Sequence, residues 1–111
     1  MSEAEASVLD TLVDIIAATA QPDRIILFGS RATGGARQDS DYDFLVVVPE
    51  VENERHVSRR IYRALLDHRI DAAVDIIVVD RDTLAQHGDT PGMIYREALT
   101  EGEVAYDRAD A

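Results

Sequence analysis

The sequence predicts an α/β domain in which helices flank one central sheet of mixed strand direction. Three observations predict it: short apolar runs bounded by proline or glycine, helical periodicity between those runs, and a length of 111 residues. Such runs are typical of buried strands, and strands that alternate with helices are typical of a helix-covered sheet. Since a domain usually takes about 100–200 residues, we expect a single domain over residues 1–111, with its core at about 8–106.

The first elements follow from local signals. Ser2 and Glu5 form a capping box, and apolar residues then recur at helical spacing, so the first helix is expected to run to about Ala20. An apolar run between a proline and a glycine predicts the first strand, Arg24–Phe28. The turn that follows predicts a brief helix around Ser30–Thr33 and then a loop.

The later elements continue the alternation of strand and helix. We expect them at the following ranges: strand Asp41–Val48, helix Glu52–Arg69, strand Ala73–Val79, helix Asp82–His87, helix Met93–Thr100 and strand Glu103–Tyr106. Asp80 is suited to cap the helix that follows it, and Gly102 is suited to end the last helix. Beyond them, the segment from Arg108 to Ala111 is expected to fray.

The charge balance and the missing residue types exclude several classes of protein. Acidic residues number 22 against 11 basic ones, all of them arginine, and the net charge is -11. Such a chain has no broad cationic surface, so no direct nucleic-acid binding is expected, and its field favours basic protein partners or cations. Without cysteine, disulfides, zinc–thiolate sites and thiol nucleophiles are excluded. The chain has no apolar run long enough for a membrane span and begins with an acidic segment, so we expect a cytoplasmic protein.

Two carboxylates open the second expected strand. Side chains alternate between the faces of a strand, so Asp41 and Asp43 point the same way, about 6.6 Å apart along the strand. Asp75 interrupts a second apolar run, where an acid is seldom left unpaired. Where the two strands are neighbours, the three carboxylates converge into an oxygen-only site that suits magnesium or manganese. The alternatives are a solvated strand end for the first two acids and an exposed edge position for Asp75.

A glycine and a serine stand where the first strand leaves the sheet. Gly29 lets the backbone turn sharply and lets a ligand approach the main chain, and Ser30 begins a helical turn whose amides and hydroxyl can face an anion. Neither the lysine of a Walker motif nor the spacing of a dinucleotide-binding loop accompanies them. A purely structural turn is the alternative for this pair taken alone.

Taken together, these residues resemble a known family. Phe28–Ala32 followed by Ser40–Phe44 resembles the defining motif of the nucleotidyltransferase superfamily of the DNA polymerase beta type, and Asp75 matches its third acid. Phe44 stands where leucine or isoleucine is more usual. The resemblance covers about residues 8–106 and implies the nucleotidyltransferase fold. The small size resembles the minimal nucleotidyltransferases of prokaryotes, which are commonly encoded as antitoxins with HEPN-domain ribonuclease partners.

The resemblance implies transfer of a nucleotide from a nucleoside triphosphate, with ATP expected as substrate and two magnesium ions as cofactors. The ions, about 3.5–4 Å apart, would clamp an in-line displacement at the α-phosphate. Asp41 and Asp43 would bridge both ions. Asp75 would bind the ion nearest the attacking hydroxyl and help to activate that hydroxyl. These three aspartates are the predicted catalytic and metal-binding residues.

The resemblance also implies which residues hold the nucleotide. Gly29 and Ser30 would hold the terminal phosphates, and pyrophosphate would leave. Arg31 would neutralise charge on the triphosphate or on the leaving group. The alternative for Arg31 is a surface arginine that pairs with Asp39 or Asp41.

The acceptor of the nucleotide has several candidates. The resemblance points to a hydroxyl, expected to be a tyrosine, on a cognate HEPN toxin, so that the chain acts as a type VII-like antitoxin and can form a hetero-oligomer with the toxin. A basic ribonuclease would complement the charge of -11. A polymerase and a small-molecule enzyme of the aminoglycoside type are weakened because 111 residues leave little room for a second binding domain. The rival of a different class is a non-catalytic antitoxin that inhibits by binding.

Arginines gather along the expected third helix, at Arg55, Arg59, Arg60, Arg63 and Arg69. Several are spaced four residues apart, which makes one face of that helix locally basic. A solvated face balanced by neighbouring glutamates is one interpretation, and a contact with a partner or with a second copy of the chain is the other.

Overall fold

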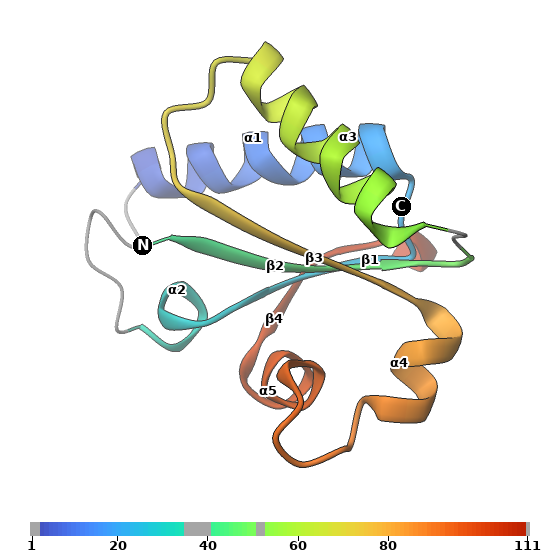
Figure 1. The fold of residues 1–111 in the computed structure, drawn as a ribbon. Coiled ribbons are helices and arrows are strands. Elements are labelled where there is room, and N and C mark those ends of the chain that lie inside the picture. The colour runs from blue at the N-terminus through green and yellow to red at the C-terminus, as the bar shows by residue number, and fades with distance from the viewer. Residues whose placement is uncertain (1–2, 35–40, 51–52, 111) are drawn as a thin grey trace.

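A four-stranded sheet separates two layers of helices in the computed structural model, which describes residues 3–34, 41–50 and 53–110 (Figure 1). Its elements in chain order are α1 (Glu3–Ala20), β1 (Arg24–Phe28), α2 (Ser30–Thr33), β2 (Tyr42–Val48), α3 (Glu54–Asp67), β3 (Val74–Asp80), α4 (Arg81–His87), α5 (Ile94–Glu101), β4 (Glu103–Asp107) and a 3-10 helix (Arg108–Asp110). Helices α1 and α3 cover one face, and α4 and α5 cover the other. Within the described ranges, no helix has the length and apolarity that a membrane span requires.

The sheet has mixed strand directions, as predicted. The strand order is β3-β2-β1-β4. β1 is antiparallel to both of its neighbours, β2 and β4, whereas β2 and β3 are parallel. Parallel neighbours need a crossover connection, and α3 supplies it. As a result, the starts of β2 and β3 and the end of β1 lie at the same end of the sheet.

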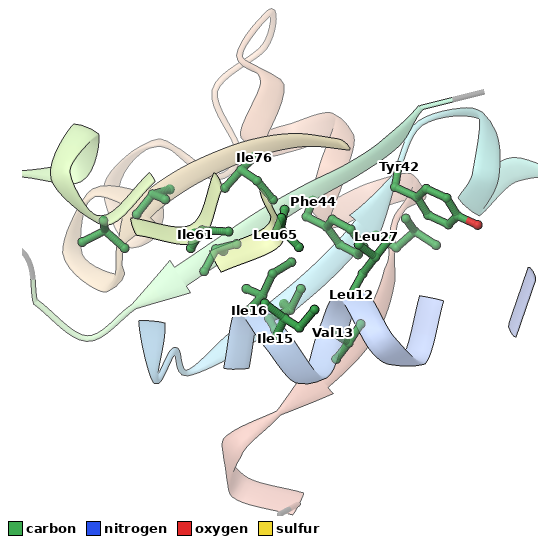
Figure 2. Packing of buried hydrophobic residues seen from close by; sticks show 14 of the residues in the cluster. Leu12, Val13, Ile15, Ile16, Leu27, Tyr42, Phe44, Ile61, Leu65 and Ile76 are labelled. Carbon is green, nitrogen blue, oxygen red and sulfur yellow. The ribbon is translucent and has the colours of Figure 1, made fainter. Parts of the chain in front are cut away.

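The side chains of β2 alternate between the two helix layers. Figure 2 shows Tyr42 and Phe44 on the same side as Leu12 of α1. On the opposite face, Leu45 packs with residues of α4 and α5. Phe44, Leu12 and Leu45 have no exposed surface, so both faces of the strand are tightly covered. The alternation therefore directs Asp43, which lies between Tyr42 and Phe44, toward the layer of α4 and α5.

The first half of the chain follows the predicted boundaries closely. α1 ends at Ala20, and β1 and α2 have the predicted limits. β2 begins at Tyr42, one residue after the predicted start at Asp41. The capping residue expected for α1, Ser2, lies outside the described residues, as does most of the loop expected after α2.

Helix α3 is shorter than predicted at both ends. The side chain of Asn53 accepts a hydrogen bond from the backbone N–H of His56 at 3.1 Å, so the helix begins directly after this cap. At the other end, Arg69 adopts a φ of 53, in the left-handed region, and the helix ends at Asp67. A sequence pattern of helical periodicity does not reveal these two local features.

The remaining elements differ from the prediction by one residue: β3 and α5 are shifted by one residue at both ends, and α4 and β4 are each longer by one residue at one end. Asp80 caps α4 as predicted, because its carboxylate accepts hydrogen bonds from the N–H of Thr83 at 2.7 Å and from its hydroxyl at 3.0 Å. The end of the chain, which was expected to fray, instead forms a 3-10 helix over Arg108–Asp110. The N–H of Arg108 donates to the carbonyl of Asp23 at 2.9 Å, and this long-range contact orders the segment.

Candidate active site

Two aspartates lie side by side on neighbouring strands. The parallel register of β2 and β3 pairs Asp43 with Asp75, and paired residues of neighbouring strands project from the same face of a sheet. Leu45 and Ile77, two residues further along each strand, pack in the cluster formed with α4 and α5, which identifies the face. Asp43 is half-buried and Asp75 is exposed. The pair therefore lies at the start of both strands, with one side open to solvent.

The carboxylate of Asp43 lies against the main chain of Gly29. A Cβ atom placed on Gly29 would collide with the Oδ2 atom of Asp43 and would stand 3.3 Å from its Cγ. Gly29 also has a φ of 74, a conformation that residues with a side chain rarely adopt. Both the space and the backbone conformation at this turn therefore require glycine, and the structure brings the predicted turn directly to the predicted carboxylate.

Ser30 and Arg31 begin the short helix α2 directly after that turn. The guanidinium of Arg31 stacks over the ring of Tyr42, 4.0 Å from its centroid. The Tyr42 ring in turn stacks on Phe44, with 6.3 Å between centroids. This cation–π contact holds the Arg31 head group against Tyr42, whose side chain lies on the opposite face of β2 from Asp43. Asp39, one of its two alternative partners from the sequence, lies outside the described residues.

The surroundings of Asp43 disfavour its charged form. Burial raises the pKa of this carboxyl most, and the nearby charges of Asp75, Asp41 and Glu97 raise it further. Glu97 lies on α5 and was not predicted as part of the site. Its sequence neighbourhood contains no motif, and only the packing of α5 against β1 brings it near, so the sequence offered no signal for it.

The carboxylates suit a hard divalent cation, although they do not form a closed cage. Among the residues whose positions are described, no three side chains of histidine, cysteine, aspartate or glutamate are grouped to hold a metal ion. Asp43 and Asp75 lie together, and Asp41 is exposed just before β2. Magnesium is usually bound by one or two carboxylates together with substrate phosphates and water. An oxygen-only pair whose charges repel each other fits such an ion, because a cation would relieve that repulsion.

A hollow on α5 adjoins the site through Glu97. It has a volume of about 550 Å³ and is lined by Gly92, Met93, Ile94, Arg96, Glu97, Thr100 and Glu101. Met93 and Ile94 are among the exposed large apolar residues. The hollow therefore combines apolar and charged groups on the same side of the sheet as the aspartate pair.

Comparison with known proteins identifies the family. Residues 10–111 match the family described as Polymerase beta, Nucleotidyltransferase. A candidate nucleotidyltransferase from Sulfolobus solfataricus has a TM-score of 0.65 at 20% identity, over 95% of this chain and 82% of that one. A toxin–antitoxin structure with AMP-PNP has a TM-score of 0.58 at 18% identity, over 91% of this chain and 76% of that one. At these identities the likeness shows the fold alone, and no curated protein matches the sequence. Because the family match spans nearly the whole chain, this chain belongs to the polymerase beta nucleotidyltransferase family.

Proposed function

We propose that this nucleotidyltransferase transfers AMP from ATP to a side-chain hydroxyl, expected to be a tyrosine, of a HEPN ribonuclease toxin, and so acts as a type VII-like antitoxin. The observation that carries the proposal is the position of Asp43, whose carboxylate lies against the main chain of Gly29 and beside Asp75. A turn that holds phosphates and a carboxylate pair that holds cations are the two parts that nucleotidyl transfer needs at one place. A toxin–antitoxin structure with AMP-PNP on the same fold supports the choice of partner and nucleotide.

Asp41, Asp43 and Asp75 are the residues that would hold magnesium. Bound there, the ions would supply charge neutralisation on the triphosphate and would lower the pKa of the attacking hydroxyl. Asp43 is the central ligand in this proposal, because it is paired with Asp75 on the neighbouring strand and its carboxylate lies against the main chain of Gly29. The half-buried position restricts its side chain and so helps to fix where the nucleotide binds.

The other residues of the site each have a separate role. Gly29 and Ser30 would hold the terminal phosphates at the start of α2, next to the Asp43 carboxylate that lies against the main chain of Gly29. Arg31, which directly follows Ser30 on α2, would compensate negative charge on the departing pyrophosphate. Asp75 accepts the proton of the acceptor hydroxyl while the hydroxyl oxygen forms its bond to the α-phosphorus and the bond to pyrophosphate breaks.

A protein acceptor suits the surface around the site. Asp75 is exposed, so a hydroxyl on a macromolecule can reach it without entering a deep cavity. The hollow on α5 offers the exposed apolar residues Met93 and Ile94 next to Glu97, which is a suitable surface for a partner segment with apolar and basic residues. The net charge of -11 favours encounter with a basic ribonuclease.

Intact-mass spectrometry of the toxin tests the proposal. The purified chain, the co-encoded toxin, ATP and magnesium are incubated together, and one or several AMP units should be added to the toxin. A substoichiometric amount of this chain should be sufficient, because an enzyme turns over. The matched control is Asp43→Asn, which keeps the shape of the side chain and should add no mass.

Two other outcomes would replace the proposal. If protection of RNA needs equimolar chain, persists in Asp43→Asn and adds no mass to the toxin, the chain is a binding antitoxin. If the toxin stays unmodified while ATP is consumed in the presence of an aminoglycoside, the acceptor is a small molecule.

A further inference from the structure

The outward side of α3 carries basic and apolar residues that the proposed reaction does not use. Its exposed residues include Arg55, Arg59, Tyr62, Arg63 and Leu66, which lie along one side of the helix, and we call this set the α3 stripe. Leu66 is 74% exposed, more than the other exposed large apolar residues of the described chain. Arg63 lies 3.4 Å from Asp67, whereas Arg55 and Arg59 form no ion pair with any described residue.

The outward side of α1 is acidic, whereas that of α3 is basic. Its exposed residues include Ser7, Asp10, Thr11, Asp14 and Ala18, which we call the α1 stripe. All five side chains are short, so another helix can approach closely. Neither Asp10 nor Asp14 forms an ion pair within the part of the chain that is described. The α1 stripe therefore presents two unpaired negative charges, whereas the α3 stripe presents the positive charges of Arg55 and Arg59 together with that of Arg63, which also contacts Asp67.

The stripes match in spacing as well as in charge. Asp10 and Asp14 are four residues apart, as are Arg59 and Arg63, which places each pair about 6 Å apart along its helix. Figure 1 shows α1 and α3 in one layer on the same face of the sheet. A two-fold axis through this layer places the α1 stripe of each copy on the α3 stripe of the other, so every contact forms twice. Leu66 would then be covered by short side chains of the second copy.

We propose that the chain associates with a second copy of itself through this helix layer. The charge of -11 on each copy opposes the approach, but charges more than about 8 Å apart are largely screened at physiological ionic strength, whereas the arginines and aspartates meet at contact. Covering Leu66 and Tyr62 also removes apolar surface from water. Asp43 and Asp75 face the opposite layer, so the dimer leaves both candidate sites open, and the proposal does not depend on the proposed function.

Two charge-reversal variants test the contact. Arg59→Asp with Arg63→Asp makes the α3 stripe acidic, and Asp10→Arg with Asp14→Arg makes the α1 stripe basic. In sedimentation velocity over a concentration series, the wild-type chain should shift from monomer to dimer. Each variant alone should stay monomeric, because like charges then face each other at both copies of the contact.

An equimolar mixture of the two variants supplies the decisive measurement. In a mixed dimer both contacts again pair opposite charges, so the mixture should dimerise although neither component does. Arg96→Asp, on α5 in the opposite layer, is the control and should dimerise as the wild type does. Melting temperatures should show that every variant is folded, since all the changed residues are exposed.

Three results would overturn the proposal: a wild-type chain that stays monomeric throughout the series, a dimer that survives either reversal, or a mixture that stays monomeric. If the wild type is monomeric and the reversals instead abolish binding of the toxin, this layer is a surface for the toxin and not for a second copy.

Discussion

Asp43 is paired with Asp75 across the parallel strands β2 and β3, so two carboxylates share one face of the sheet at the start of both strands. Two like charges at this spacing repel each other, and the pKa of Asp43 is raised by burial first and by Asp75 second. Such an arrangement lowers the stability of the metal-free protein, which is the usual consequence of gathering charges for catalysis. Replacing Asp43 by a residue that cannot ionise makes this loss of stability measurable.

Asp43→Asn should abolish nucleotidyl transfer and raise the melting temperature of the metal-free protein. Because the pKa of folded Asp43 lies above its ordinary value of 3.8, the stability from this group is fully present below pH 3.8 and is lost as the pH rises through the folded pKa. Asparagine cannot ionise and avoids that loss. Calorimetric scans should show the rise at neutral pH and none below pH 3.8.

Asp89→Asn, an exposed aspartate between α4 and α5, is the control and should change neither activity nor melting temperature. A strong destabilisation of Asp43→Asn at neutral pH would instead mean that the Asp43 carboxylate holds the fold together.

Gly29→Ala should destabilise the fold and remove transfer. Alanine at a φ of 74 is strained, by about 1–3 kcal/mol for a sparsely populated conformation, and its Cβ would also displace the carboxylate of Asp43. The matched control is Gly34→Ala, since Gly34 has a φ of 85 but no described atom within 4 Å of its added Cβ. Urea unfolding should show a loss in both variants, larger for Gly29→Ala, and transfer should survive only in Gly34→Ala. Equal transfer by the two variants would contradict the placement of Asp43 against Gly29.

Arg81→Ala should make stability less sensitive to acid. The Nε of Arg81 donates to Asp23 at 2.8 Å, and its Nη2 donates to the other carboxylate oxygen at 3.0 Å. This hydrogen bonding lowers the pKa of Asp23 below 3.8, so the pair stabilises the fold above pH 3.8 and that stability is lost as the pH falls through the folded pKa. The variant should therefore have a lower urea midpoint at neutral pH, and the difference from wild type should shrink in acid.

Arg63→Ala is the comparison for the Arg81–Asp23 pair, because it removes an ion pair that is more exposed. Its contact with Asp67 is 3.4 Å long and both side chains are mostly exposed, so the urea midpoint of the monomer, measured at low protein concentration, should hardly move. A larger effect for Arg63→Ala than for Arg81→Ala would show that exposure does not decide the strength of these pairs.

Tyr62→Phe should weaken the outer edge of the sheet. The hydroxyl of Tyr62 accepts a hydrogen bond from the N–H of Ile76 at 2.8 Å, on the edge strand β3. A hydrogen bond of this kind contributes about 0.5–1.5 kcal/mol, and water can replace it in part at an edge, so we expect the lower end of that range. Faster amide hydrogen exchange at Ile76, relative to Tyr106→Phe as control, is the measurement. Unchanged exchange would mean that Ile76 is protected by other contacts.

Local patterns in the sequence were sufficient for the elements and for part of the site. The turn at Gly29, the alternation that separates Asp43 from Phe44, and the cap at Asp80 each depend on a few neighbouring residues, because backbone conformation and strand alternation are set locally. These were predicted, and the structure has them. Family membership also follows from motif residues that stand close together in the sequence.

Only the tertiary structure decided which of these residues meet. The parallel pairing that places Asp75 beside Asp43, the approach of Glu97 from α5, and the ordering of Arg108 by Asp23 join segments that are distant in sequence. Strand order and direction depend on how the crossover helix and the whole core pack, and burial free energy is a property of the assembled layers. The same holds for Asp41. The alternation of a strand predicts that Asp41 and Asp43 project from the same face, but β2 begins only at Tyr42, the first residue of the strand that is buried in the core, and Asp41 is exposed just before it.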